Sequence, residues 1–92
     1  MKINAVAVSP NDNVAVATQP LKKGDDVVVS GQAVCVAAED IELGHKVALS
    51  SIAAGESVLR YGEPIVRATR DIRQGELVHV HNTEPLPGDL KE

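Results

Sequence analysis

The sequence predicts a mostly β domain built from two related halves of short strands. Four segments obey one spacing rule, in which an aliphatic residue is followed three positions later by glycine and six positions later by valine. The four segments are Leu21–Val27, Ile41–Val47, Ile52–Val58 and Ile72–Val78. Gly24 lies 31 residues before Gly55, and Gly44 lies 31 residues before Gly75, so one unit is used twice. No segment carries the sustained apolar stripe of an amphipathic helix, with its period of about 3.6 residues.

Apolar, β-branched stretches separated by turn signals predict the individual strands. The expected strands of the first half are Ile3–Val8, Val14–Ala17, Val27–Ser30 and Ala33–Ala37. Residues 9–13 form a dense turn signal, and Gly31-Gln32 suits a tight two-residue turn, so two hairpins are expected.

The four repeat glycines should adopt positive φ, because glycine has no Cβ to clash in that conformation. Asp40 and Asp71 precede the repeat isoleucines and are expected to accept backbone N–H bonds as turn formers. A single helical turn near residues 50–54 is the one helical alternative. The domain should span residues 1–83, followed by an extended or disordered tail at 84–92, which could also pack on a partner as an arm.

The composition predicts a small domain with a thin aliphatic core. The chain has 92 residues, no Phe, no Trp and a single aromatic residue, Tyr61. Such a chain buries only about 60–65% of the surface that its unfolded form exposes. A larger partner covering one face would add buried apolar area, which suggests a subunit.

Charge and hydropathy exclude several classes of function. The formal net charge of −4 argues against nucleic-acid binding, which depends on Lys and Arg at phosphates. No apolar run approaches the roughly 18 residues of a membrane span, and the start lacks a signal-peptide core. The single Cys35 excludes an internal disulfide and fits a buried small hydrophobe better than a nucleophile. The expected location is the cytoplasm.

All three histidines, His45, His79 and His81, lie shortly after repeat glycines. If residues 78–81 continue a strand, His79 and His81 share its outer face while Val78 and Val80 face the core. Neutral imidazole ligates metals and moves protons near neutral pH, although an outer strand face also tolerates histidine without a function. His79 and His81 are therefore candidate metal ligands, and a site shared with a partner chain is favoured over one held by this chain alone.

Arg60-Tyr61 is a second candidate site, because a guanidinium and a phenol together suit an acidic, hydroxylated small molecule. The alternative is a solvated Arg60 beside a Tyr61 that caps the core. Lys46, next to His45, could bind a carboxylate or be an ordinary surface charge.

Four motifs in this order resemble the small N-terminal SAF domain of the altronate/galactarate dehydratase family. They are Asp12–Ala17, Gly44–Leu49, Tyr61–Ile65 and His79–Asn82. The resemblance covers residues 3–83 and implies a β-clip fold with two pseudo-two-fold related halves, similar to type III antifreeze protein. One departure is Val66, where many relatives have glycine, so the pocket could differ here.

The resemblance implies a cytoplasmic hydro-lyase that removes water from a sugar acid to give a 2-keto-3-deoxy acid. The chain would be a small subunit, inactive alone, that acts with a large catalytic subunit on a small hydroxy-acid substrate. A divalent metal, expected to be iron(II), would be held mainly by the large subunit. Carried over to this sequence, the expected catalytic residues are His45, His79 and His81, and the expected substrate-binding residues are Lys46, Arg60, Tyr61 and Asn82.

Two alternatives remain open. Two-chain relatives include sulfolactate sulfo-lyase, which expels sulfite rather than water, so the chain could be its small subunit. SAF-type domains also serve as binding appendages, so a non-catalytic module that binds a carbohydrate acid or docks on a partner is the other alternative.

Overall fold

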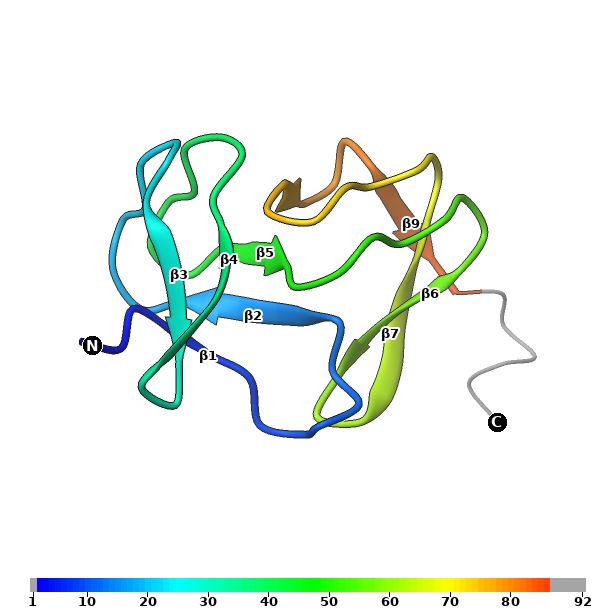
Figure 1. Ribbon diagram of the computed structural model, residues 1–92. Coiled ribbons are helices and arrows are strands. Elements are labelled where there is room, and N and C mark those ends of the chain that lie inside the picture. The colour runs from blue at the N-terminus through cyan, green and yellow to red at the C-terminus, as the bar shows by residue number, and fades with distance from the viewer. Residues whose placement is uncertain (1, 87–92) are drawn as a thin grey trace.

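The computed structural model describes residues 2–86, which form nine short strands and no helix (Figure 1). The strands are β1 (Ala5–Val6), β2 (Val14–Ala17), β3 (Asp26–Val29), β4 (Gln32–Val36), β5 (Lys46–Ala48), β6 (Ser57–Arg60), β7 (Glu63–Ala68), β8 (Leu77–Val78) and β9 (Thr83–Pro85). The predicted mostly β class is confirmed. The helical turn considered near residues 50–54 does not form, because this stretch belongs to the third glycine turn.

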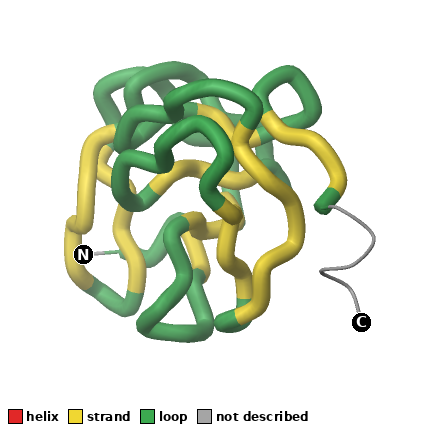
Figure 2. Tube along the Cα trace, turned by 90° about the vertical axis from the view of Figure 1, so that its right-hand side faces the viewer, coloured by secondary structure: helices red, strands yellow, loops and turns green. Residues whose placement is uncertain are grey.

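A four-stranded antiparallel sheet in the order β1-β2-β5-β8 lies at the centre of the fold. The hairpin β3–β4 lies at one end and the hairpin β6–β7, extended by β9, lies at the other (Figure 1). Figure 2 shows from the side how long loops connect these short strands. Adjacent residues of β2 point to opposite faces, so Val14 and Ala15 enter two different aliphatic clusters. Each half of the chain thus packs its own aliphatic core against one face of the central sheet.

The predicted duplication is present in the backbone. An isolated antiparallel bridge joins Leu21 to Ile41, and its equivalent 31 residues later joins Ile52 to Ile72. β5 and β8, which occupy equivalent positions in the two halves, pair antiparallel with each other, as a two-fold relation between the halves requires. The four repeat glycines have φ of +93°, +85°, +88° and +88° in chain order, which confirms the predicted positive φ.

Asp40 and Asp71 accept backbone N–H bonds, as predicted, but the donors lie 17 residues away and not in the aspartates' own turns. The carboxylate of Asp40 accepts a bond from the backbone N–H of Lys23, and that of Asp71 accepts one from Ala54, both at 2.9 Å. These bonds hold the two bridged segments of each half together.

Asparagine side chains bond to the backbone of both hairpins, which the sequence did not predict. Asn4 donates to the carbonyl of Asp26 and accepts from the N–H of Val28, both at 2.8 Å. Asn13 repeats this pattern with Ser57 and Leu59, at 3.0 and 2.7 Å. Each hairpin has a register shift at this point, between Val27 and Val28 and between Val58 and Leu59. We call this arrangement an asparagine clamp.

The structure describes the first residues of the predicted tail. β9 contains Thr83–Pro85, and Leu86 is 8% exposed, so the first residues of the predicted tail pack on the domain. Arg67 Nε donates to Glu84 Oε2 at 2.7 Å and ties β9 to β7. The rest of the predicted tail, residues 87–92, lies outside the described residues. Within residues 2–86 no helix has the length and apolarity needed to cross a membrane.

Candidate functional site

The rings of His45 and His79 stack at the edge of the β5–β8 ladder. Their centroids are 4.5 Å apart, and the ring planes differ by 14°. β5 pairs Lys46 with Val78 and Val47 with Leu77, so the next position of the same register sets His45 opposite His79. Two of the three predicted catalytic histidines therefore lie together.

The second glycine turn fixes the backbone of His45. Gly44 donates its N–H to the carbonyl of Ala17 at 2.8 Å, and Ala17 donates to the carbonyl of His45 at 2.9 Å. The side chain is 31% exposed, and its Nε2 lies 3.9 Å from Oε1 of Glu42. Nδ1 is buried and has no hydrogen-bond partner among residues 2–86. Buried polar atoms are rarely left unpaired, so Nδ1 of His45 is unusual among the side-chain polar atoms of residues 2–86.

His45 departs from the rule that the other three glycine turns follow. In those turns the residue after glycine is acidic, and its carboxylate accepts the N–H of the residue three positions earlier. The pairs are Asp25 with Lys22, Glu56 with Ala53 and Glu76 with Arg73, at 2.9, 2.7 and 2.7 Å. His45 occupies the equivalent position without a carboxylate, so the turn itself does not explain why an imidazole is present. The stack with His79 is the contact that distinguishes it.

His79 lies in a turn, so the strand predicted through Val80 is wrong. β8 ends at Val78, and residues 79–82 form a turn in which Val80 is 78% exposed rather than buried. The cause is Asn82, whose side-chain oxygen accepts the N–H of His79 at 2.9 Å and whose amide donates to the carbonyl of Leu77 at 2.8 Å. These bonds fold residues 79–82 back onto the end of β8 and so end the strand. His79 and His81 therefore do not share a strand face.

The described residues do not fit a metal ion. No group of three or more His, Cys, Asp or Glu side chains that could hold a metal is present in residues 2–86. A site held by protein ligands alone uses about four of them, and catalytic zinc keeps three. The nitrogen lone pairs of two nearly parallel rings lie in separate planes and do not converge on one point. A metal site that His79 and His81 share with a partner chain stays a prediction.

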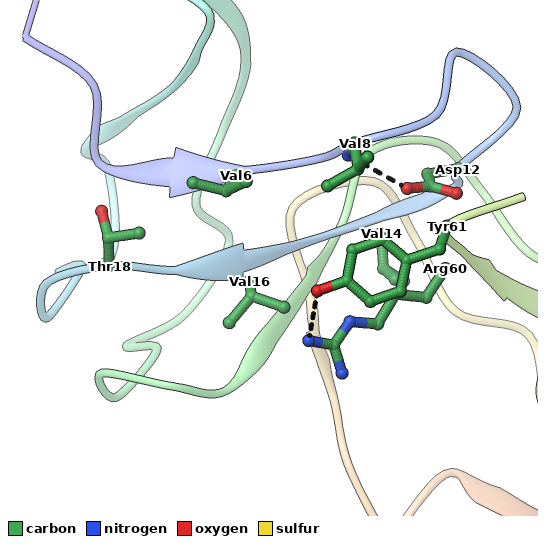
Figure 3. Close-up of a pocket in the computed structure, with 8 residues that line it drawn as sticks. All are labelled: Val6, Val8, Asp12, Val14, Val16, Thr18, Arg60 and Tyr61. Carbon is green, nitrogen blue, oxygen red and sulfur yellow. Dashed lines mark hydrogen bonds between the residues drawn. The ribbon is translucent and has the colours of Figure 1, made fainter.

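Arg60 and Tyr61 lie at the turn between β6 and β7 and contact each other. Nη2 of Arg60 lies 3.1 Å from the phenol oxygen, and the guanidinium carbon lies 4.7 Å from the ring centroid (Figure 3). Tyr61 has φ of +57° and is 57% exposed. The alternative of a core-capping tyrosine is therefore wrong.

Asp12 holds this turn in place. Its carboxylate accepts the N–H of Gly62 at 2.7 Å and those of Ser9 and Val8 at 3.1 and 3.2 Å. Burial acts to raise the pKa of Asp12, but the backbone donors outweigh it and hold the pKa below its usual value.

A pocket of about 190 Å³ lies beside Arg60 and Tyr61 (Figure 3). Its other lining residues are Val6, Val8, Val14, Val16, Thr18 and Asp12. Four valines give it an apolar character that suits a hydrocarbon group better than a chain of hydroxyl groups. In Figure 1 the β6–β7 turn lies at the lower edge of the molecule, well apart from β8. The predicted substrate-binding residues therefore do not gather in one place. Arg60 and Tyr61 line the valine pocket. Half-buried Lys46 follows His45 in sequence, but its position on β5 directs it to the opposite face of the sheet.

Asn82 and Cys35 have contacts that account for them structurally. Asn82 is 3% exposed, and its oxygen and its amide both bond to backbone groups of its own turn. Cys35 is half-buried against the first cluster, and burial raises the pKa of its thiol. A raised pKa disfavours the reactive thiolate, which agrees with the small-hydrophobe interpretation.

The glycine-hinged duplicated β fold, with its histidines at the edge of the central sheet, defines a small domain of the SAF class. The sequence profile described as "Altronate/galactarate dehydratase SAF domain" matches residues 3–86. The chain belongs to this family. It is 38% identical to altronate dehydratase of Bacillus subtilis over 86 residues, or 94% of this chain, and 46% identical to that of Escherichia coli over 81 residues, or 88%.

The chain spans only 17% and 16% of the length of these two altronate dehydratases. A shorter similarity links it to subunit alpha of (2R)-sulfolactate sulfo-lyase from Chromohalobacter salexigens. That match has 48% identity over 44 residues, which is 48% of this chain and 47% of the relative. The relatives are thus lyases, and this domain is a small part of the two altronate dehydratases.

Proposed function

We propose that this chain is the SAF component of a sugar-acid dehydratase of the altronate or galactarate type. It acts in the cytoplasm with a larger catalytic component and contributes His45 and His79 to the shared active site. The observation that carries this proposal is the stacking of the His45 and His79 rings. The other three repeat turns have an acidic residue at the position of His45, so the repeat alone does not account for this histidine.

The chemistry of dehydration suits two imidazoles. One base removes the proton beside the carboxylate, the neighbouring C–O bond breaks, and an acid protonates the departing hydroxyl so that it leaves as water. The resulting enol becomes the 2-keto-3-deoxy acid. Neutral imidazole accepts a proton and imidazolium donates one, and both forms occur near neutral pH. We assign the pair to proton transfer or substrate orientation at this centre.

A catalytic component would cover the histidines through two exposed apolar side chains. Leu43, in the turn that carries His45, is 61% exposed, and Val80, in the turn that carries His79, is 78% exposed. Contiguous exposed apolar patches rimmed by polar residues mark interaction sites, and we propose that Leu43 and Val80 belong to such a patch. The corresponding positions before the other repeat glycines hold Lys23, Ala54 and Gln74, so Leu43 is the large apolar residue of the set. We place the divalent metal implied by the resemblance, expected to be iron(II), on the catalytic component.

Co-expression with the altronate dehydratase-like large chain of the same organism tests the proposal. With ferrous ion added, the pair should convert altronate or galactarate to a 2-keto-3-deoxy acid, while either chain alone stays at background. The variants His45→Ala and His79→Ala should assemble normally and lose turnover. A pair that assembles yet leaves every aldonate and aldarate unchanged would overturn the assignment.

The second candidate is the small subunit of a sulfolactate sulfo-lyase. Its support is the 48% identity to a sulfo-lyase subunit alpha, although that match covers 48% of the chain against 94% and 88% for the altronate dehydratases. The wider coverage favours a sugar acid. Release of sulfite from (2R)-sulfolactate by the same pair would reverse this preference. Normal turnover by the variant lacking both His79 and His81 would instead support a docking module without a chemical role.

A further inference from the structure

We propose that Asn82 is a positioning residue whose side chain holds His79 against His45, and that it does not bind substrate directly. The inference builds on the proposed role of the two histidines. It rests on a geometric pattern that occurs three times in this chain.

Three asparagines make the same clamp. In each case the amide nitrogen donates to the carbonyl of one residue, and the amide oxygen accepts the N–H of the residue two positions later. The clamps join Asn4 to Asp26 and Val28, Asn13 to Ser57 and Leu59, and Asn82 to Leu77 and His79. The first two sit at equivalent register shifts of the two hairpins. The third lies where β8 ends and has no equivalent 31 residues earlier, because position 51 is Ser51.

The third clamp acts on a residue of the candidate site. Its acceptor bond ends on the backbone N–H of His79, and the adjacent carbonyl of His79 accepts from Asn82 N–H at 3.2 Å and from Thr83 Oγ1 at 2.8 Å. Both backbone polar groups of His79 are therefore bonded to the segment 82–83. Fixing the backbone also restricts the ring, whose stacking partner His45 is held independently by the Gly44 turn. The stack is thus preorganised before any partner binds.

Direct contact with substrate is disfavoured for Asn82. The residue is 3% exposed, and its oxygen and nitrogen already have partners at 2.9 and 2.8 Å. A substrate atom would have to break a buried clamp bond and leave a backbone group of Leu77 or His79 unpaired.

The contact between the two rings can be measured by NMR in the full chain without any partner. In the wild type, a nuclear Overhauser effect should connect ring protons of His45 and His79, and both rings should show ring-current shifts. Asn82→Ala removes both clamp bonds. The Overhauser contact should therefore be lost, and the ring-proton shifts of both histidines should move toward the values of unstacked rings. Asn82→Asp keeps the acceptor for His79 N–H, so it should retain the contact. Asn13→Ala is the matched control, because it removes the same clamp from β6 and should leave both histidine spectra unchanged.

The outcomes separate positioning from general stability. Unchanged ring shifts and contact in Asn82→Ala would overturn the proposal, as would equal disturbance by Asn13→Ala. If Asn82→Ala does not fold, loss of the ring contact in a folded Asn82→Asp would equally refute the acceptor role. Since the readout needs no turnover, failure of the proposed lyase activity would leave this result intact. In an active pair, Asn82→Asp should also retain more turnover than Asn82→Ala.

Discussion

The carbonyl oxygen of Val36 occupies the space that a side chain at Gly75 would need. A Cβ built at Gly75 overlaps this oxygen, whereas one built at Gly24, Gly44 or Gly55 meets no atom within 4 Å. The N–H of Ala38 also donates to the carbonyl of Gly75 at 2.8 Å. The fourth turn is thus packed against the first half of the molecule, although all four glycines share one conformation.

Gly75→Ala should therefore destabilise the fold far more than Gly24→Ala. Both substitutions impose positive φ on alanine, at about 1–2 kcal/mol. Gly75→Ala adds a backbone collision, for a total above about 3 kcal/mol or a failure to fold. Urea unfolding of the two variants measures the difference. Similar losses for both would show that the fourth turn can move away from Val36.

Asp12→Asn should remove an acid-sensitive part of the stability. The pKa of Asp12 is lowered in the folded state, so its contribution is fully present above the unfolded pKa of about 3.9 and is lost as pH falls through the folded value. The contribution should be about 1 kcal/mol or less, because water screens this partly buried carboxylate. The free energy of unfolding of wild type and variant should be measured at pH 7 and between pH 5 and 2.5. The two values should differ at pH 7 and become equal at the lowest pH. A constant difference across that range would contradict the assignment.

His45→Asp should separate stability from function. The aspartate would restore the acid found after the other three repeat glycines and offer an acceptor to the N–H of Glu42. The free energy of unfolding should stay equal or rise by up to about 1 kcal/mol, while the co-expressed pair loses dehydratase turnover because the stack is gone. Thermal unfolding and product assay on the same preparation check both halves. A strongly destabilised variant would mean that the imidazole itself supports the turn.

Val80→Lys and Leu43→Lys should weaken assembly with the large chain without harming the isolated domain. Both side chains are more than half exposed, so unfolding of the chain alone should change by no more than about 0.5 kcal/mol. Burying a charge in the interface should weaken binding at least about ten-fold, or 1.4 kcal/mol. Val34→Lys is the control, at a 41% exposed valine on β4, outside the two turns that carry His45 and His79. Equal binding of the wild type and the three variants to the large chain would place the interface elsewhere.

Much of the fold was readable from spacing. The repeat glycines and the first two hairpins came from local rules, because positive φ and tight turns are decided by neighbouring residues. The clamps of Asn4 and Asn13 were not readable, since their partners lie 22 to 46 residues away. The strand through Val80 was mispredicted because the alternation of Val78 and Val80 is a valid strand pattern, whereas the bonds of Asn82 to Leu77 and His79 turn the chain back after Val78.

By itself the sequence determined a duplicated, glycine-hinged β scaffold and its family, because backbone conformation at glycine and the alternation of aliphatic residues are local properties. Only the tertiary structure decided which candidate residues form a site. The antiparallel register of β5 with β8 brings His45 to His79 across 34 positions of sequence, while Arg60 and Tyr61 are carried to a different end of the molecule. Pairing register is set by long-range packing of the two cores against one sheet, and no short window of sequence contains it.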